Sequence, residues 1–162
     1  TCSPAAPRKN RKTEFETTMP AFNMMDSFKG CLLAGASGDA LGAPVEFFSP
    51  QSIFNLYGKE GIRDLDEAYG VVGAITDDTQ MSLFTAEACI QFALYTESES
   101  LYLLENSIKK AYGRWFNTQE RSDNRVIEAN GYLASLPELN NRRGPGNTCM
   151  SVENGNVDGG GY

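Results

Sequence analysis

The spacing of apolar residues is the feature that most restricts what this chain can fold into. In one stretch they recur at positions i, i+3, i+7 and i+11, as Met81, Phe84, Ala88 and Phe92, which places them on one face of a helix. No segment alternates between apolar and polar residues for more than a few positions, as a half-buried strand would. No repeat of about 20–50 residues is present either. The sequence therefore predicts an all-α fold.

Helix-capping and helix-breaking residues set the expected boundaries. The first helix begins near Met24, and Pro44 ends or kinks it. Ser49-Pro50 is typical of a helix N-terminus, so we expect a short helix that runs to Tyr57. A loop with two short apolar stretches is expected between residues 58 and 73. Three more helices are expected over about residues 78–95, 100–117 and 124–136.

The helix expected to begin near Met24 is unusual because it contains four glycines, at Gly30, Gly35, Gly38 and Gly42. Glycine weakens a helix by about 1 kcal/mol per residue relative to alanine. Such a helix is tolerable where neighbouring helices pack closely against its bare faces. We therefore expect this helix to be buried in the centre of the fold.

The four cysteines are widely spaced and form no CxxC pair, at Cys2, Cys31, Cys89 and Cys149. Cys31 and Cys89 lie within apolar helical patterns, so we expect them to be buried free thiols. No disulfide framework is predicted, and a reducing cytoplasm is the expected compartment. The apolar stretches are shorter than the about 18 residues that a membrane span needs, so we expect no membrane partner.

The charge of the chain argues against nucleic acid as a partner. The formal net charge is −7, so the surface as a whole repels phosphate backbones. Residues 1–22 are the exception, because they contain a basic cluster that is either a solvated tail or a contact for an acidic partner. We expect these residues to form a flexible basic arm that precedes a helical domain over residues 23–162.

The chain contains no histidine, which removes several classes of catalyst. Ser-His-Asp and Cys-His hydrolases, acid–base catalysis by histidine and His-ligated zinc all need an imidazole. Any chemistry by these residues must therefore use carboxylates, hydroxyls, amides and a hard metal ion.

The densest group of such residues is Thr76-Asp77-Asp78. It stands at the expected start of a helix, where unpaired N–H groups and the helix dipole favour a capping hydroxyl and first-turn acids. The same oxygens suit Mg²⁺, which typically uses one or two carboxylates together with waters and substrate oxygens. The residues alone leave both interpretations open, and a metal ion would need further ligands from elsewhere in the fold.

Two further segments carry candidate residues. Glu46 follows the helix break and stands beside two phenylalanines, so it is either a surface carboxylate or an acid poised in a pocket. Arg143-Gly144-Pro145-Gly146 dictates a turn, after which Asn147 or Thr148 is expected to cap a helix. This turn is either a simple connector or a loop that shapes a site.

Together these segments resemble the ADP-ribosylglycohydrolase family. The resemblance covers about residues 26–152 and rests on Gly30-Cys31-Leu32-Leu33-Ala34-Gly35, Gly38-Asp39-Ala40-Leu41-Gly42 with Glu46, Thr76-Asp77-Asp78-Thr79, and Arg143-Gly144-Pro145-Gly146-Asn147-Thr148. It implies an orthogonal, all-helical domain with two Mg²⁺ ions in a cleft, or Mn²⁺ in some members. The family's later Asp-x-Asp-[Thr/Ser] motif is not in this sequence, so we expect only the N-terminal part of such a domain.

The resemblance also implies roles for individual residues. Thr76, Asp77 and Asp78 match metal ligands, and Asp77, Asp78 or Glu46 would act as the catalytic base. The implied reaction releases ADP-ribose from an ADP-ribosylated protein, by hydrolysis of the bond between the ribose anomeric carbon and the acceptor side chain. Its transition state would be oxocarbenium-like, as in other glycoside hydrolyses.

Two other functions stay open at this point. An immunity protein on the same scaffold would neutralise an ADP-ribosyltransferase toxin, partly through the arm of residues 1–22. An inactive fragment or degenerate member would lack the remaining metal ligands, unless a second chain supplied them.

Overall fold

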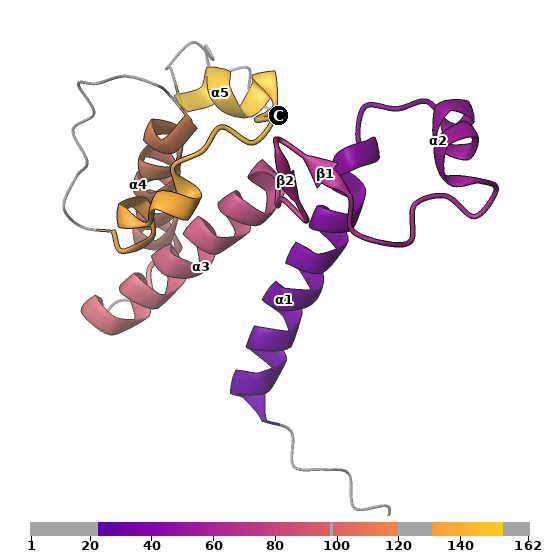
Figure 1. The fold of residues 1–162 in the computed structure, drawn as a ribbon. Coiled ribbons are helices and arrows are strands. Elements are labelled where there is room, and N and C mark those ends of the chain that lie inside the picture. Colours follow the sequence, from indigo (N-terminus) through magenta and orange to yellow (C-terminus); the bar gives the residue numbers. More distant parts are fainter. Residues whose placement is uncertain (1–22, 98, 120–130, 154–162) are drawn as a thin grey trace, which may run out of the picture.

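The computed structural model describes residues 23–97, 99–119 and 131–153 of the 162 in the sequence. Helices dominate it, with one small two-stranded sheet, which confirms the predicted all-α fold (Figure 1). The predicted basic arm, residues 1–22, lies outside the described ranges. Within those ranges, no helix is long and apolar enough to cross a membrane. The α-helices are α1 (Met24–Gly42), α2 (Pro50–Tyr57), α3 (Asp77–Tyr95), α4 (Leu101–Gln119) and α5 (Asn147–Glu153).

Local capping signals explain where the first two helices begin. Asn23 caps α1 and Ser49 caps α2, each by accepting a hydrogen bond from a backbone N–H of the first turn. After Gly42, α1 gives way to a 3₁₀-helix, Ala43–Val45, which contains Pro44. The predicted end of the first helix and the predicted short second helix are therefore both confirmed.

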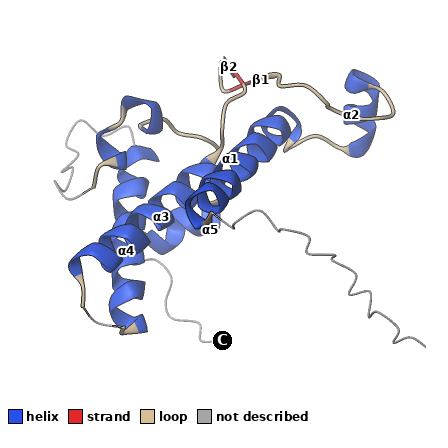
Figure 2. Cartoon of the chain, turned by 90° about the horizontal axis from the view of Figure 1, so that it is seen from below, coloured by secondary structure: helices blue, strands red, loops and turns tan. Residues whose placement is uncertain are grey.

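A small antiparallel hairpin lies between α2 and α3 (Figure 2). Its strands are β1 (Glu67–Ala68) and β2 (Val71–Val72). The two turn residues, Tyr69 and Gly70, have φ angles of 53° and 78°. Two positive φ angles are the signature of a two-residue hairpin turn that matches the twist of the strands. The sequence predicted only a loop here, because two-residue strands are too short to show alternation.

The core lies where α3 and α4 pack against each other (Figure 1). Phe84 and Ala88 of α3 and Ala111 and Trp115 of α4 are all 0% exposed. Large aromatic side chains contribute most of the buried area in such an interface. The predicted apolar face of α3 is confirmed at Phe84 and Ala88, and Met81 packs against the same cluster.

The prediction that α1 is buried in the centre of the fold is wrong for the described residues. The N-terminal half of α1 extends away from α3 and α4 (Figure 1), and Ala40 is the buried residue of this helix. Within the described ranges nothing packs closely on the bare faces of the helix. A Cβ would meet no atom within 4 Å at any of Gly30, Gly35, Gly38 and Gly42.

The predicted burial of two cysteines is wrong for related reasons. Cys31 is exposed because α1 is largely uncovered, and Cys89 is exposed because it follows Ala88 and so points away from the α3–α4 interface. Cys149 is half-buried. All three are free thiols, which confirms that part of the prediction for Cys31 and Cys89.

The helix predicted over residues 124–136 is not present in its described part. Residues 120–130 lie outside the described ranges, and Leu133–Ser135 forms a single 3₁₀ turn. Leu136 is extended, with ψ of 121°, because the residue before a proline avoids the helical region. The N–H of Leu133 donates to the carboxylate of Glu87 at 2.9 Å, so it is not available for a helix ladder.

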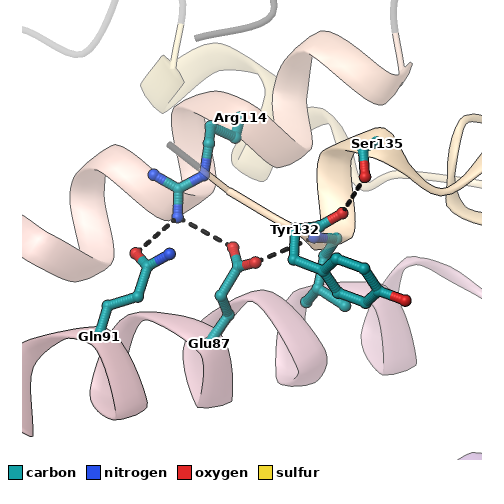
Figure 3. Close-up of polar contacts among 6 residues, drawn as sticks. Glu87, Gln91, Arg114, Tyr132 and Ser135 are labelled. Atoms are coloured by element: carbon teal, nitrogen blue, oxygen red, sulfur yellow. Dashed lines mark hydrogen bonds and ion pairs between the residues drawn. The ribbon is translucent and has the colours of Figure 1, made fainter. Parts of the chain in front are cut away.

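A buried ion pair ties this segment to α3 and α4 (Figure 3). Arg114 donates to Glu87 at 3.0 Å and to Gln91 at 3.4 Å. The side chains of Arg114 and Glu87 are only 6% and 9% exposed. Gly131 lies so close that a Cβ there would overlap the guanidinium of Arg114. Glu87 therefore joins α3 to α4 through Arg114 and to the following loop through Leu133.

We expect Glu87→Gln to lower the free energy of unfolding by about 3 kcal/mol, because it leaves the buried Arg114 charge without its counter-ion. Denaturant unfolding followed by circular dichroism measures this. The matched control is Glu105→Gln, which breaks the exposed pair with Lys109 and should change little. Equal effects of the two substitutions would contradict the prediction.

Candidate active site

The start of α3 presents Thr76-Asp77-Asp78 as the sequence predicted. Thr76 is the N-cap, and its hydroxyl accepts a hydrogen bond from the N–H of Asp78 at 3.2 Å. Asp77 and Asp78 occupy the first turn, where the positive end of the helix dipole favours negative charge. Asp77 is 8% exposed, whereas the side chain of Asp78 is open to solvent. The capping interpretation is therefore confirmed, and it leaves the carboxylates available for other contacts.

Asp39, near the end of α1, contacts the candidate site, although the sequence alone suggested no role for it. Its carboxylate accepts hydrogen bonds from the N–H of Thr76 at 2.8 Å and from the Thr76 hydroxyl at 2.7 Å. It also accepts from the hydroxyl of Thr79. One side chain of α1 thus fixes the first turn of α3. The only signal in the sequence was its place in the Gly38-Asp39 segment.

The hydrogen-bond pattern of Thr76 suits a metal ligand. A hydroxyl has one proton to donate and two lone pairs. The Thr76 hydroxyl donates its hydrogen bond to Asp39, and one of its lone pairs accepts from the N–H of Asp78. One lone pair of the Thr76 oxygen therefore remains for a further partner.

The turn over residues 143–146 lies against Asp77. The N–H of Asp77 donates to the carbonyl of Arg143 at 3.0 Å. The N–H of Gly146 interacts with the Asp77 carboxyl. The sequence left open whether this turn is a simple connector or a loop that shapes a site. Its contacts with Asp77 favour the second interpretation.

The helix after this turn is present, but its cap is not the one predicted. α5 begins at Asn147, and the carbonyl of Gly146 accepts from the N–H of Met150 at 3.1 Å. Gly146 therefore occupies the position predicted for Asn147 or Thr148.

A buried network of side-chain amides, Gln80 and Gln119, supports the turn over residues 143–146. The side-chain oxygen of Gln80 accepts from Trp115 at 3.2 Å and from Gln119 at 2.9 Å. Its nitrogen donates to the carbonyl of Asn141 at 3.1 Å. Gln119 in turn accepts from the N–H of Arg143 at 3.2 Å. The network links α3, α4 and the loop that contacts Asp77.

Electrostatic coupling joins the candidate carboxylates. Burial raises the pKa of Asp77 above its ordinary value and the charges of Asp78 and Asp39 raise it further, while the backbone N–H groups of Asp77 and Gly146 oppose the shift. Partial burial raises the pKa of Glu46, and the charges of Asp77, Asp78 and Asp39 add to this. The structure therefore brings Glu46 into the same electrostatic neighbourhood as Asp77 and Asp78.

The side-chain oxygens of Thr76, Asp77 and Asp78 are the kind of ligand that a hard cation prefers, but they are too few to fill its coordination sphere. Within the described part of the chain, no three acidic, cysteine or histidine side chains form a group that could hold a metal ion. Mg²⁺ typically takes only one or two protein carboxylates and fills its octahedron with waters and substrate oxygens. Thr76, Asp77 and Asp78 are thus suited to supply part of a coordination sphere.

Comparison with known proteins adds to this geometry. Residues 21–157 match the family described as ADP-ribosylglycohydrolase, which is most of the chain. The chain belongs to the ADP-ribosylglycohydrolase family. An uncharacterized protein of Archaeoglobus fulgidus is 36% identical over 96 residues, which are 57% of this chain and 28% of that relative. The chain thus aligns with less than a third of that relative's length. No solved structure matches this chain.

We expect Asp39→Ala to lower the free energy of unfolding by about 2–3 kcal/mol, because the N–H and hydroxyl of Thr76 and the hydroxyl of Thr79 lose their acceptor. Urea unfolding measures the loss. Asp64→Ala, at an exposed position, is the control. A similar small effect of both substitutions would show that Asp39 does not hold the start of α3.

Asp77→Asn should raise the melting temperature of the metal-free chain at pH 7. The pKa of Asp77 is raised in the folded state, so folding favours its protonated form and stability falls as the pH rises from its ordinary value of 3.8 through the folded value. Asparagine keeps the acceptor for Gly146 but carries no charge. Thermal unfolding in EDTA at pH 7 and near pH 3 tests this, and a gain that is equal at both pH values would refute it.

Proposed function

We propose that this chain is part of a metal-dependent hydrolase that removes ADP-ribose from modified protein side chains. The observation that carries the proposal is the first turn of α3, where Thr76, Asp77 and Asp78 present oxygen ligands in one place. Membership of the ADP-ribosylglycohydrolase family supports the reaction type. Mg²⁺, or Mn²⁺, would supply positive charge that orients ribose hydroxyls and lowers the pKa of a water.

The residues of the chain then divide the remaining work. Thr76, Asp77 and Asp78 would hold the cation, and Asp39 would keep the Thr76 oxygen turned toward it. Glu46 suits the proton transfer best, because its side chain is open to solvent on one side, while partial burial and the neighbouring carboxylates raise its pKa. A carboxyl whose pKa lies closer to the working pH is a more effective acid–base catalyst. Glu46 would take the proton of the water whose oxygen bonds to the anomeric carbon. The bond from that carbon to the acceptor side chain would break, and the departing side-chain atom would receive the proton.

Activity provides the first test. Incubation with ADP-ribosylated protein should release ADP-ribose in the presence of Mg²⁺, and Asp77→Ala combined with Asp78→Ala should abolish the release. The matched control is Asp64→Ala, which removes an exposed carboxylate outside the site. Release that persists in the double variant, or in EDTA, would reject the assignment of the site.

Metal binding provides a readout that does not need a complete enzyme. A cation that binds only the folded state stabilises it, by about 2.7 kcal/mol at one hundred times its dissociation constant. Mg²⁺ should therefore raise the melting temperature of the wild type but not that of the double variant. Equal shifts in the two proteins would show that the cation binds elsewhere.

The immunity alternative rests on the arm of residues 1–22, which lies outside the described residues. Nothing in the described structure bears on a toxin partner. The immunity alternative therefore stays a prediction from the sequence, whereas the geometry of the site supports the proposed hydrolase.

A further inference from the structure

Tyr69 has the most unusual backbone conformation in the described part of the chain. It is the only residue other than glycine there with a positive φ, at 53°. A bulky side chain in this left-handed region costs of order 1 kcal/mol and persists only where the surroundings hold it. Gly70 beside it, with φ of 78°, takes the same region without that cost. The contacts of Tyr69 must therefore explain why it occupies the turn.

The side chain of Tyr69 packs on the turn that contacts Asp77. A Cβ added at Gly144 would overlap the Tyr69 hydroxyl, so the phenol lies directly against the backbone of Gly144. The guanidinium carbon of Arg143 lies 5.7 Å from the centroid of the Tyr69 ring, within the range of a cation–π interaction. Gly144 itself has a φ of 73°. Tyr69 thus touches two consecutive residues of this loop.

Those two residues lead directly to the candidate site. The carbonyl of Arg143 accepts the hydrogen bond from Asp77, and Gly146 interacts with the Asp77 carboxyl. The hydroxyl of Tyr69 also lies close enough for electrostatic contact with Glu46, Asp77 and Asp39. The pKa of Tyr69 is raised, chiefly by burial and further by the charges of those three carboxylates, while the charge of Arg143 lowers it.

We propose that Tyr69 is a positioning residue of the active site, which presses the Arg143–Gly146 turn against the start of α3 and so fixes the Asp77 carboxylate. The inference rests on the proposed function for its consequence in metal binding. The contacts of Tyr69 are with the loop rather than with reacting atoms, so it acts through Asp77. Its role explains why a bulky residue occupies the strained turn, and its hydroxyl occupies the space that a side chain at Gly144 would need.

The natural test variant is Tyr69→Gly. Glycine adopts a φ of 53° without strain, so the hairpin keeps its turn while the ring and hydroxyl are lost. Tyr69→Phe keeps the ring over Arg143 and removes only the hydroxyl, so it serves as a milder second variant if Tyr69→Gly does not fold. Tyr102→Ala, at a tyrosine that is 70% exposed on α4, is the control.

Amide hydrogen exchange and Mn²⁺ binding together decide the outcome. In Tyr69→Gly, the Asp77 amide should exchange about tenfold faster, while the Thr76 amide, which Asp39 holds, keeps its protection. Mn²⁺ affinity, measured by electron paramagnetic resonance of the free ion, should fall about tenfold, as for other residues that orient a metal ligand. Tyr69→Phe should show smaller changes in the same direction, and Tyr102→Ala none.

Unchanged exchange at Asp77 in both Tyr69 variants would overturn the inference, whatever the metal does. Faster exchange with unaltered Mn²⁺ affinity would overturn it as well, because the loop would then not position a ligand. If the wild type itself bound no Mn²⁺, the proposed metal site would fail, while the exchange of the Asp77 amide would still decide whether Tyr69 holds the loop.

Discussion

The buried side-chain amide of Gln80 is the interaction on which the arrangement of the site depends. It lies one turn after Asp77 on α3 and is fully buried, together with Trp115 and Gln119. Its oxygen accepts from both of these residues, and its nitrogen donates to the loop at Asn141. Each bond contributes only about 1 kcal/mol net, but an unpaired amide at this depth would cost more than that. The network therefore permits one register of α3, α4 and the loop.

This constraint matters because the site itself resists folding. Burial disfavours the charged form of a carboxylate and neighbouring carboxylates repel it, and these two effects raise the pKa values of Asp77 and Glu46. The start of α3 is held from two sides, by Asp39 of α1 and by the loop that Gln119 supports. Neighbouring elements thus hold the acids in an arrangement that the acids alone would not adopt. A bound cation would convert the same repulsion into attraction.

The parts of this arrangement that were predictable from sequence are the local ones. The caps at Ser49 and Thr76 follow from a side chain and a backbone N–H that lie within three residues of each other. Asp39 contacts Thr76 across 37 positions, and Gln80 contacts Gln119 across 39, so no local pattern marks either pair. The hairpin gave no signal because its strands are too short to show alternation and because Tyr69 in its turn occupies a conformation that its residue type disfavours. Tertiary contacts decide all three.

The end of α1 shows how one short segment can supply two kinds of carboxylate. Asp39 lies before the break at Pro44, and several donors from α3 fix the orientation of its carboxylate. Glu46 lies just after the break, where the chain leaves the helix and the side chain is exposed. Partial burial and the charges of the neighbouring acids raise the pKa of Glu46. The helix end thus separates a carboxylate that holds structure from one that is free to exchange a proton, and the proposed hydrolysis requires both.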